Sequence, residues 1–119
     1  MSPIKARKRM LTILKIPNEP TLYLPLLEFL NDDKQHSMKE IVVYLTKYFK
    51  LSKEAREELK LSGKETVFHN RVHWSKYTLK SKGYVKGIKK GTITITKKGK
   101  ELLATNPTEL NLRYTKKII

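Results

Sequence analysis

The sequence predicts a small α+β domain of three to four helices and a β-hairpin, on three observations. First, apolar residues recur at helical spacing in three segments before residue 83. Second, Thr92–Thr96 is an alternating, β-branched run that follows a Gly-bounded turn, as in a hairpin. Third, the net charge is +15, and residues 66–100 hold ten of the 26 basic residues and no Asp or Glu. A basic helix followed by a basic hairpin is what a winged helix-turn-helix presents to a polyanion.

Length and composition limit the possible functions. The 119 residues are enough for one domain, and the 39% hydrophobic content supports a small core rather than a large catalytic cleft. The absence of cysteine excludes disulfides and thiolate metal sites, and it fits a cytoplasmic protein. No apolar run approaches the roughly 18 residues of a membrane span, and no signal-peptide pattern is present. The charge therefore predicts a polyanionic partner, and lysines spread over a helix and a hairpin favour nucleic acid over a membrane surface.

Residues 1–18 are expected to form a basic N-terminal arm ahead of the domain, which is predicted to span residues 19–107. The arm contains five basic side chains and no acid. It is either a flexible segment that contacts phosphates or a short helix or strand that packs on the domain. Apolar spacing predicts the first helix over residues 21–31. This helix begins only at Leu24 if Pro25 lies in its first turn.

Capping residues predict two further helices. Ser37 and Glu40 fit a capping box that opens a helix ending near Phe49. Ser52 is expected to cap a short helix to about Leu59, and the mixed charges there indicate a solvent-exposed face.

The third main helix is predicted from Thr66 to Lys82, with Gly83 at its C-terminal end. Its core face is expected to consist of Phe68, Val72, Ser75 and Leu79. The opposite face has no acid and consists of His69, Asn70, His73, Lys76, Tyr77 and Lys80. Trp74 lies at one border of the two faces and Arg71 at the other.

The hairpin is predicted from a strand at Tyr84–Lys86, a turn over residues 87–91 and a strand at Thr92–Thr96. Thr96 is then expected to cap a last helix, Lys97 to Ala104, which the Asn106-Pro107 step ends. Residues 108–119 have no strong pattern and are expected to be a C-terminal tail or the start of a linker.

Four segments between residues 20 and 107 carry a recognisable pattern: LPLLEFL, HSMKEIV, LSKEAREELKLSGKETVFHNRVHWSKYTLKSKGYV and GTITITKKGKELL. The most specific part combines Leu61-Ser62-Gly63, Phe68-x-Asn70-Arg71-Val72-x-Trp74 and Tyr77-x-Leu79-x-x-x-Gly83. Together they resemble the N-terminal domain of Mrr-type restriction endonucleases. The resemblance implies a winged helix-turn-helix that binds DNA. In that family a nuclease domain usually follows, cuts DNA with modified bases and serves prokaryotic defence; this chain stops where that domain normally begins.

If the third helix is the recognition helix, its polar face lies in the major groove. Asn70 can form two hydrogen bonds with adenine, and Lys76 and Lys80 suit phosphates. The histidines can donate to or accept from base edges or phosphates. The alternative is an ordinary solvated helix face, against which the absence of acid argues.

Two border residues have open roles. Trp74 either stacks on a base or sugar or packs half-buried against the domain. Arg71 either binds a phosphate or pairs with Glu40 or Glu65 and holds the helices together.

The hairpin supplies three more candidate contacts, which lie at or near its tip: Lys86, Lys89 and Lys90. They would place the hairpin in the minor groove or along the phosphate backbone. The alternative is an exposed turn in which lysine protects a strand edge from pairing.

No metal site, cofactor or catalytic residue is predicted. His69 and His73 have the spacing of two helical metal ligands, but residues 66–100 offer no acid as a third. Glu58-x-Lys60, with Asp32 or Asp33 upstream, matches the E-x-K of restriction nucleases only by chance, since such a site needs adjacent carboxylates around a divalent cation.

The sequence therefore predicts double-stranded DNA binding, by the target-recognition domain of a modification-dependent, Mrr-like restriction system. The DNA could be methylated, and catalysis would lie in a nuclease domain or subunit. One alternative is a stand-alone winged-helix transcriptional regulator, a homodimer formed through residues 105–119 or the arm. The other is a winged-helix module that binds protein or RNA.

Overall fold

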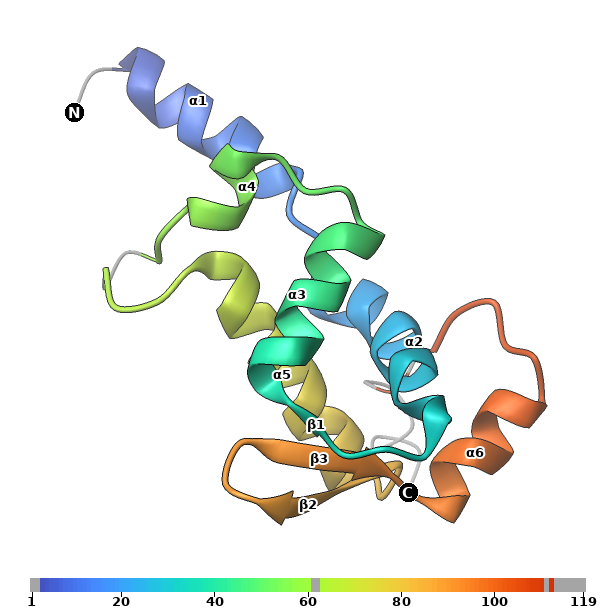
Figure 1. The fold of residues 1–119 in the computed structure, drawn as a ribbon. Helices are drawn as coiled ribbons and strands as arrows, with labels where there is room; N and C mark the ends of the chain where they lie inside the picture. The colour runs from blue at the N-terminus through green and yellow to red at the C-terminus, as the bar shows by residue number, and fades with distance from the viewer. Residues whose placement is uncertain (1–2, 61–62, 111, 113–119) are drawn as a thin grey trace.

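The structure is a computed structural model that describes residues 3–60, 63–110 and 112 (Figure 1). The described chain contains six α-helices, one 3-10 helix and three strands in the order α1 (Pro3–Leu14), α2 (Glu19–Phe29), η1 (Leu30–Asp32), β1 (His36–Ser37), α3 (Met38–Tyr48), α4 (Lys53–Glu57), α5 (Val67–Ser81), β2 (Val85–Lys89), β3 (Thr92–Ile95) and α6 (Lys97–Ala104). This is the α+β winged-helix fold that the sequence predicts. Within the described residues, no helix combines the length and apolar character required to cross a membrane.

The sheet is antiparallel, with β3 between β1 and β2. Val85 faces Ile95 across the β2–β3 pair, and the register shifts between Gly87 and Lys89. Such a bulge bends the strand and increases its twist, which turns the tip of the hairpin. Gly91 closes the turn with a φ of 77°, a backbone conformation that glycine adopts without strain.

Helices α2, α3 and α5 enclose the core, and their core faces follow the helical periodicity of the sequence. On α5 the four buried residues are those predicted: Phe68, Val72, Ser75 and Leu79. Each large apolar side chain buried here contributes about 1.5–3 kcal/mol. The polar Ser75 is tolerated because its hydroxyl lies 3.1 Å from the Glu19 carbonyl oxygen and 2.9 Å from that of Arg71.

The start of α2 differs from the prediction. Its N-cap is Asn18, whose side chain accepts a hydrogen bond from the Thr21 N–H, and Pro20 occupies the first turn. Pro25 therefore lies inside the helix, so the alternative start at Leu24 is wrong, and α2 begins two residues before the predicted Thr21. Because Asn18 already satisfies the first turn, the helix can start early; Pro25 then removes only the N–H that would bond to the Thr21 carbonyl.

The predicted caps are confirmed. The Ser37 side chain accepts from the Glu40 N–H, and the Glu40 carboxylate accepts from the Ser37 N–H, which completes the capping box. Ser52 caps α4 as predicted. Thr66, predicted as the start of the third main helix, is the cap of α5, which begins at Val67. At the far end of α5, Gly83 has a φ of 84°.

Helix α5 ends in a tight turn that is fastened to α6. The Gly83 N–H donates to the Lys80 carbonyl at 3.0 Å, and the Tyr84 N–H donates to the Leu79 carbonyl at 3.0 Å. This pair of hydrogen bonds is a Schellman motif. The Thr96 hydroxyl donates to the Gly83 carbonyl at 2.6 Å and accepts from the Gly99 N–H at 3.1 Å. Thr96 thus joins the end of α5, the end of β3 and the start of α6.

Both ends of the chain contain ordered structure. Of the two alternatives for the N-terminal arm, a flexible segment or a short packed element, the structure has a helix. Helix α1 extends from the body and contacts α4 (Figure 1). In the tail, Leu110 and Leu112 are buried in the core. Residues 113–119 lie outside the described part.

His36 is a buried polar residue at the base of the hairpin, 8% exposed and paired with Ile93 of β3. Its Nε2 lies 2.9 Å from an Asp32 oxygen, and its Nδ1 lies 3.2 Å from a Glu40 oxygen. Burial alone would lower the pKa of His36, but hydrogen bonds to Asp32 and Glu40 outweigh it and raise the pKa above the ordinary 6.5.

This raised pKa predicts a pH-dependent stability. The folded state holds the His36 proton more tightly than the unfolded state, so the stabilisation is complete below about pH 6.5 and is lost as pH rises through the folded pKa. We expect the free energy of unfolding of the wild type to fall over that window relative to a His36→Gln variant. Urea denaturation at several pH values measures this difference, and a constant difference would contradict the prediction.

Candidate nucleic-acid interface

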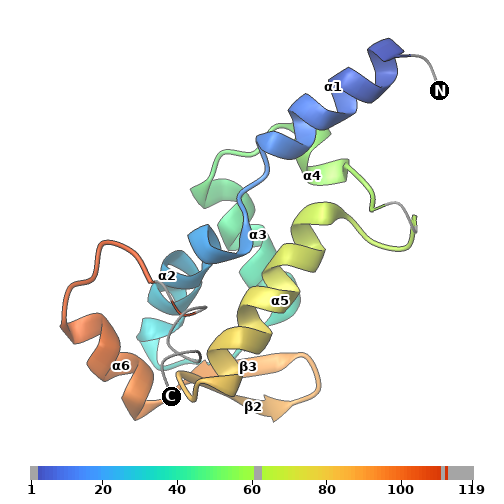
Figure 2. The same cartoon turned by 180° about the vertical axis from the view of Figure 1, so that it is seen from behind.

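Helix α5 lies on the outside of the molecule, with the hairpin at its C-terminal end (Figure 2). The exposed side chains on its polar face include His73, Tyr77 and Lys80, whereas Asn70 and Lys76 are partly buried. The helical period had placed all five opposite the core. The structure thus puts the predicted helix contacts and the basic hairpin on neighbouring surfaces.

A groove of about 280 Å³ lies between α5 and the hairpin. We call it the lysine groove, because its charged lining side chains are Lys76, Lys80, Lys89 and Lys90. Gly87 lies against the end of one of these side chains, since a Cβ there would be 3.3 Å from the Lys80 Nζ. Lys86, predicted with the hairpin lysines, is exposed on β2 but does not line the groove.

The lysine groove lacks a compensating charge, since no acidic side chain of the described residues lines it. Burial, followed by repulsion from Lys80, lowers the pKa of Lys76. Both causes disfavour the free ammonium ion, and a bound anion would relieve them. The groove therefore suits a phosphate group.

Glu65 lies at the N-terminal end of α5 and was considered from the sequence only as a possible partner for Arg71. Glu65 Oε1 accepts from Asn70 Nδ2 at 2.8 Å and lies 3.6 Å from Lys60 Nζ, and Oε2 lies 3.2 Å from His69 Nδ1. The hydrogen bond from Asn70, and then that from His69, lowers the pKa of Glu65. Helical periodicity could not find this role because Glu65 precedes the N-cap, Thr66. An acid just before the predicted start of the helix was the available signal.

Arg71 has a different partner from those predicted. Its Nη1 donates to the Ile16 carbonyl at 2.8 Å and lies 3.4 Å from the Pro17 carbonyl. Pairing with Glu40 or Glu65 was therefore a wrong prediction, because the segment before α2 brings two carbonyl oxygens closer. This side chain fastens α5 to the N-terminal part of the domain, outside the lysine groove.

Three rings form an aromatic cluster on the exposed face of α5: His73, Trp74 and Tyr77. The Trp74 ring meets His73 and Tyr77 edge to face, with centroid separations of 5.7 and 5.5 Å. Trp74 is 48% exposed and Tyr77 55% exposed. The cluster therefore offers apolar surface beside the cationic groove.

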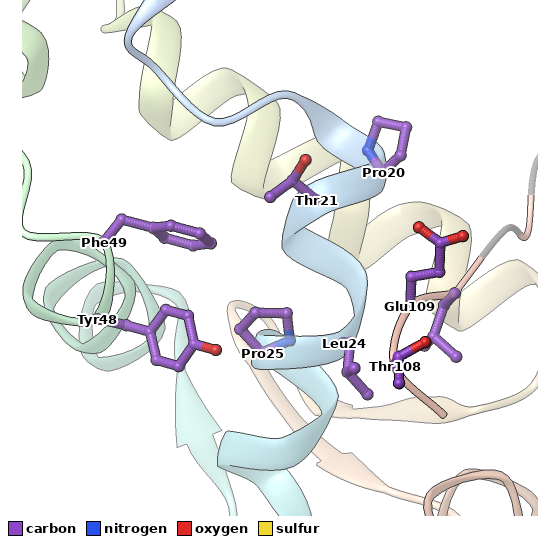
Figure 3. A pocket seen from close by; sticks show the side chains of 9 residues that line it. Pro20, Thr21, Leu24, Pro25, Tyr48, Phe49, Thr108 and Glu109 are labelled. Atoms are coloured by element: carbon purple, nitrogen blue, oxygen red, sulfur yellow. The ribbon is translucent and has the colours of Figure 1, made fainter. Parts of the chain in front are cut away.

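Among the described residues, no group of three or more His, Cys, Asp or Glu side chains could hold a metal ion. A separate pocket of about 440 Å³ lies between α2, the end of α3 and residues 108–110 (Figure 3). None of its lining residues belongs to α5 or the hairpin, so it is distinct from the candidate interface.

Comparison with known proteins assigns a family to the part of the chain that contains the sheet and α5. A family profile described as the Mrr N-terminal domain matches residues 20–105. No curated protein and no solved structure gives a match. The matched region contains the complete sheet and helices α3 to α6. The chain belongs to the Mrr N-terminal domain family, which associates it with Mrr-like restriction systems.

Proposed function

We propose that this domain binds double-stranded DNA, with α5 in the major groove and the β2–β3 hairpin along the phosphate backbone. The lysine groove is the observation that carries the proposal, because four lysines from two elements converge on a space without an acid. The B-DNA major groove, about 12 Å wide, admits an α-helix. Phosphates of one strand would then lie between α5 and the hairpin, where lysine acts as a point charge.

The domain would serve as the target-recognition part of a modification-dependent restriction system. Family membership supports this role, and the nuclease activity would belong to a domain or subunit other than this one. The aromatic cluster adds a second support, because apolar side chains contact pyrimidine methyl groups in the major groove. DNA with methylated bases is accordingly the proposed target.

Salt dependence tests the binding mode. Neutralisation of four phosphates by the lysine groove gives an expected slope of log affinity against log salt of about −3.6. Fluorescence anisotropy with a labelled duplex between 50 and 200 mM salt measures it. Affinity that stays constant over this range would contradict electrostatic binding to the backbone.

The same assay tests modification reading, with matched duplexes that are unmodified or contain N6-methyladenine or 5-methylcytosine. A preference of about tenfold, equivalent to about 1.4 kcal/mol, for one modified duplex would show that this domain reads the mark. Equal, salt-sensitive affinity for all three would limit the domain to DNA attachment or to plain sequence, as in a transcriptional regulator.

A further inference from the structure

The N-terminal end of α5 carries an acid, unlike the rest of the helix and the hairpin. Glu65 is the only acid between residues 65 and 100, and it stands at the helix end that a helix-turn-helix inserts toward base edges. We propose that Glu65 makes DNA binding selective: it accepts a hydrogen bond from the exocyclic amino group of a cytosine or adenine and repels sites that offer none. This inference rests on the DNA binding proposed above.

The backbone fixes Glu65 in place. Its carbonyl accepts from the Lys60 N–H at 3.0 Å, and Thr66 pairs with Leu59 as an isolated antiparallel bridge. The Val67 N–H donates to the Glu58 carbonyl at 2.8 Å, so the chain is held on both sides of Glu65. The carboxylate therefore has a defined position before any DNA arrives.

The side-chain contacts of Glu65 stabilise its ionised form. Asn70 and His69 both lie within hydrogen-bond distance of the carboxylate, and these contacts lower the pKa of Glu65, so it is ionised at neutral pH. The side chain remains 35% exposed. A fixed negative charge beside a phosphate backbone opposes binding unless a donor from the DNA meets it.

The chemistry of the major groove identifies that donor. Only cytosine N4 and adenine N6 present hydrogen-bond donors there, whereas guanine O6 and N7 and thymine O4 are acceptors. Glu65 offers carboxylate oxygens, and Asn70 keeps its carbonyl oxygen as an acceptor while its amide nitrogen donates to Glu65. The Glu65–Asn70 pair is therefore acceptor-rich and complementary to an exocyclic amino group.

Selection of binding sites from a random duplex pool, followed by sequencing, tests the proposal with the full chain. The wild type is expected to select cytosine or adenine at one position. Glu65→Gln keeps an oxygen that can accept from Asn70 but loses the charge, so we expect about a tenfold loss of preference at that position. We also expect tighter binding to unselected duplex. The control is Glu101→Gln on α6, which makes the same charge change away from the start of α5 (Figure 1).

Methylation of the selected amino group tests the same contact from the DNA side and identifies the base. N4-methylcytosine or N6-methyladenine at that position should weaken wild-type binding about tenfold and leave Glu65→Gln binding unchanged. Asn70→Ala, which removes the amide without adding charge, should also lose preference; thermal unfolding shows whether each variant is folded. The affinity of the wild type for the methylated duplex can be measured without any variant. This measurement therefore tests the contact even if a variant does not fold.

The outcomes separate the two proposals. Salt-sensitive duplex binding with identical base preferences in the wild type and Glu65→Gln would overturn the role of Glu65 and leave DNA binding intact. Unchanged or tighter wild-type binding to the methylated duplex would do the same. A wild type that binds no duplex at all would overturn both.

Discussion

Replacement of Lys80 and Lys89 with glutamine is expected to weaken duplex binding about 30-fold at roughly 0.15 M salt. The slope of log affinity against log salt should become shallower, its magnitude falling by about 2. One lysine comes from α5 and the other from the hairpin, and both line the lysine groove. Each is expected to neutralise one phosphate. Loss of two such contacts removes two released counterions, which sets both magnitudes.

The matched control is the pair Lys50→Gln and Lys53→Gln, which lowers the net charge by the same amount. Both lysines are exposed, one just after α3 and the other on α4, and neither lines the lysine groove. We expect less than a threefold change for this pair, because neither side chain lies where it could neutralise a phosphate in the groove. Equal losses for the two pairs would mean that net charge alone, rather than the groove, governs affinity.

Gly99→Ala is expected to destabilise the fold by about 3 kcal/mol, at the upper end of the usual cost of overpacking. A Cβ at this position would overlap the Tyr84 carbonyl oxygen and lie 2.8 Å from Ile95 Cγ1. The clash involves backbone, so α6 would have to shift away from the hairpin. Urea denaturation of the variant and the wild type measures the change.

Helix propensity predicts the opposite sign for this substitution, since alanine is favoured over glycine by about 1 kcal/mol inside a helix. Lys97→Ala on the exposed side of α6 provides the control and should change stability by less than about 0.5 kcal/mol. A Gly99→Ala protein as stable as the wild type would show that α6 is free to move. The close approach explains why a glycine stands three residues after Thr96.

The sequence was sufficient for features that depend on neighbours along the chain. The period of 3.6 residues separated the two faces of α5, as the burial of Phe68 and Leu79 shows. Local hydrogen bonding identified the caps at Ser37, Ser52 and Thr96, because each cap needs only a donor three residues later.

Features set by distant contacts were not predictable in this way. Strand β1 has two residues, and only its pairing with β3 makes it a strand. Arg71 meets carbonyl oxygens 54 and 55 residues earlier, and no local pattern encodes that distance. The two sets of lysines that line the groove were predicted, but the groove itself depends on how β2, with its bulge, packs against α5.

The contacts between α5 and the start of α2 have a consequence for the rate of association. Arg71, Ser75 and Thr78 all bond to the segment Ile16–Glu19, and the Schellman turn holds the other end of the helix. A helix held along its length loses little conformational freedom when it meets a ligand. The association rate constant should then approach the limit set by diffusion and electrostatic attraction. Changes in the DNA sequence should act mainly on the dissociation rate, and so on the lifetime of the complex.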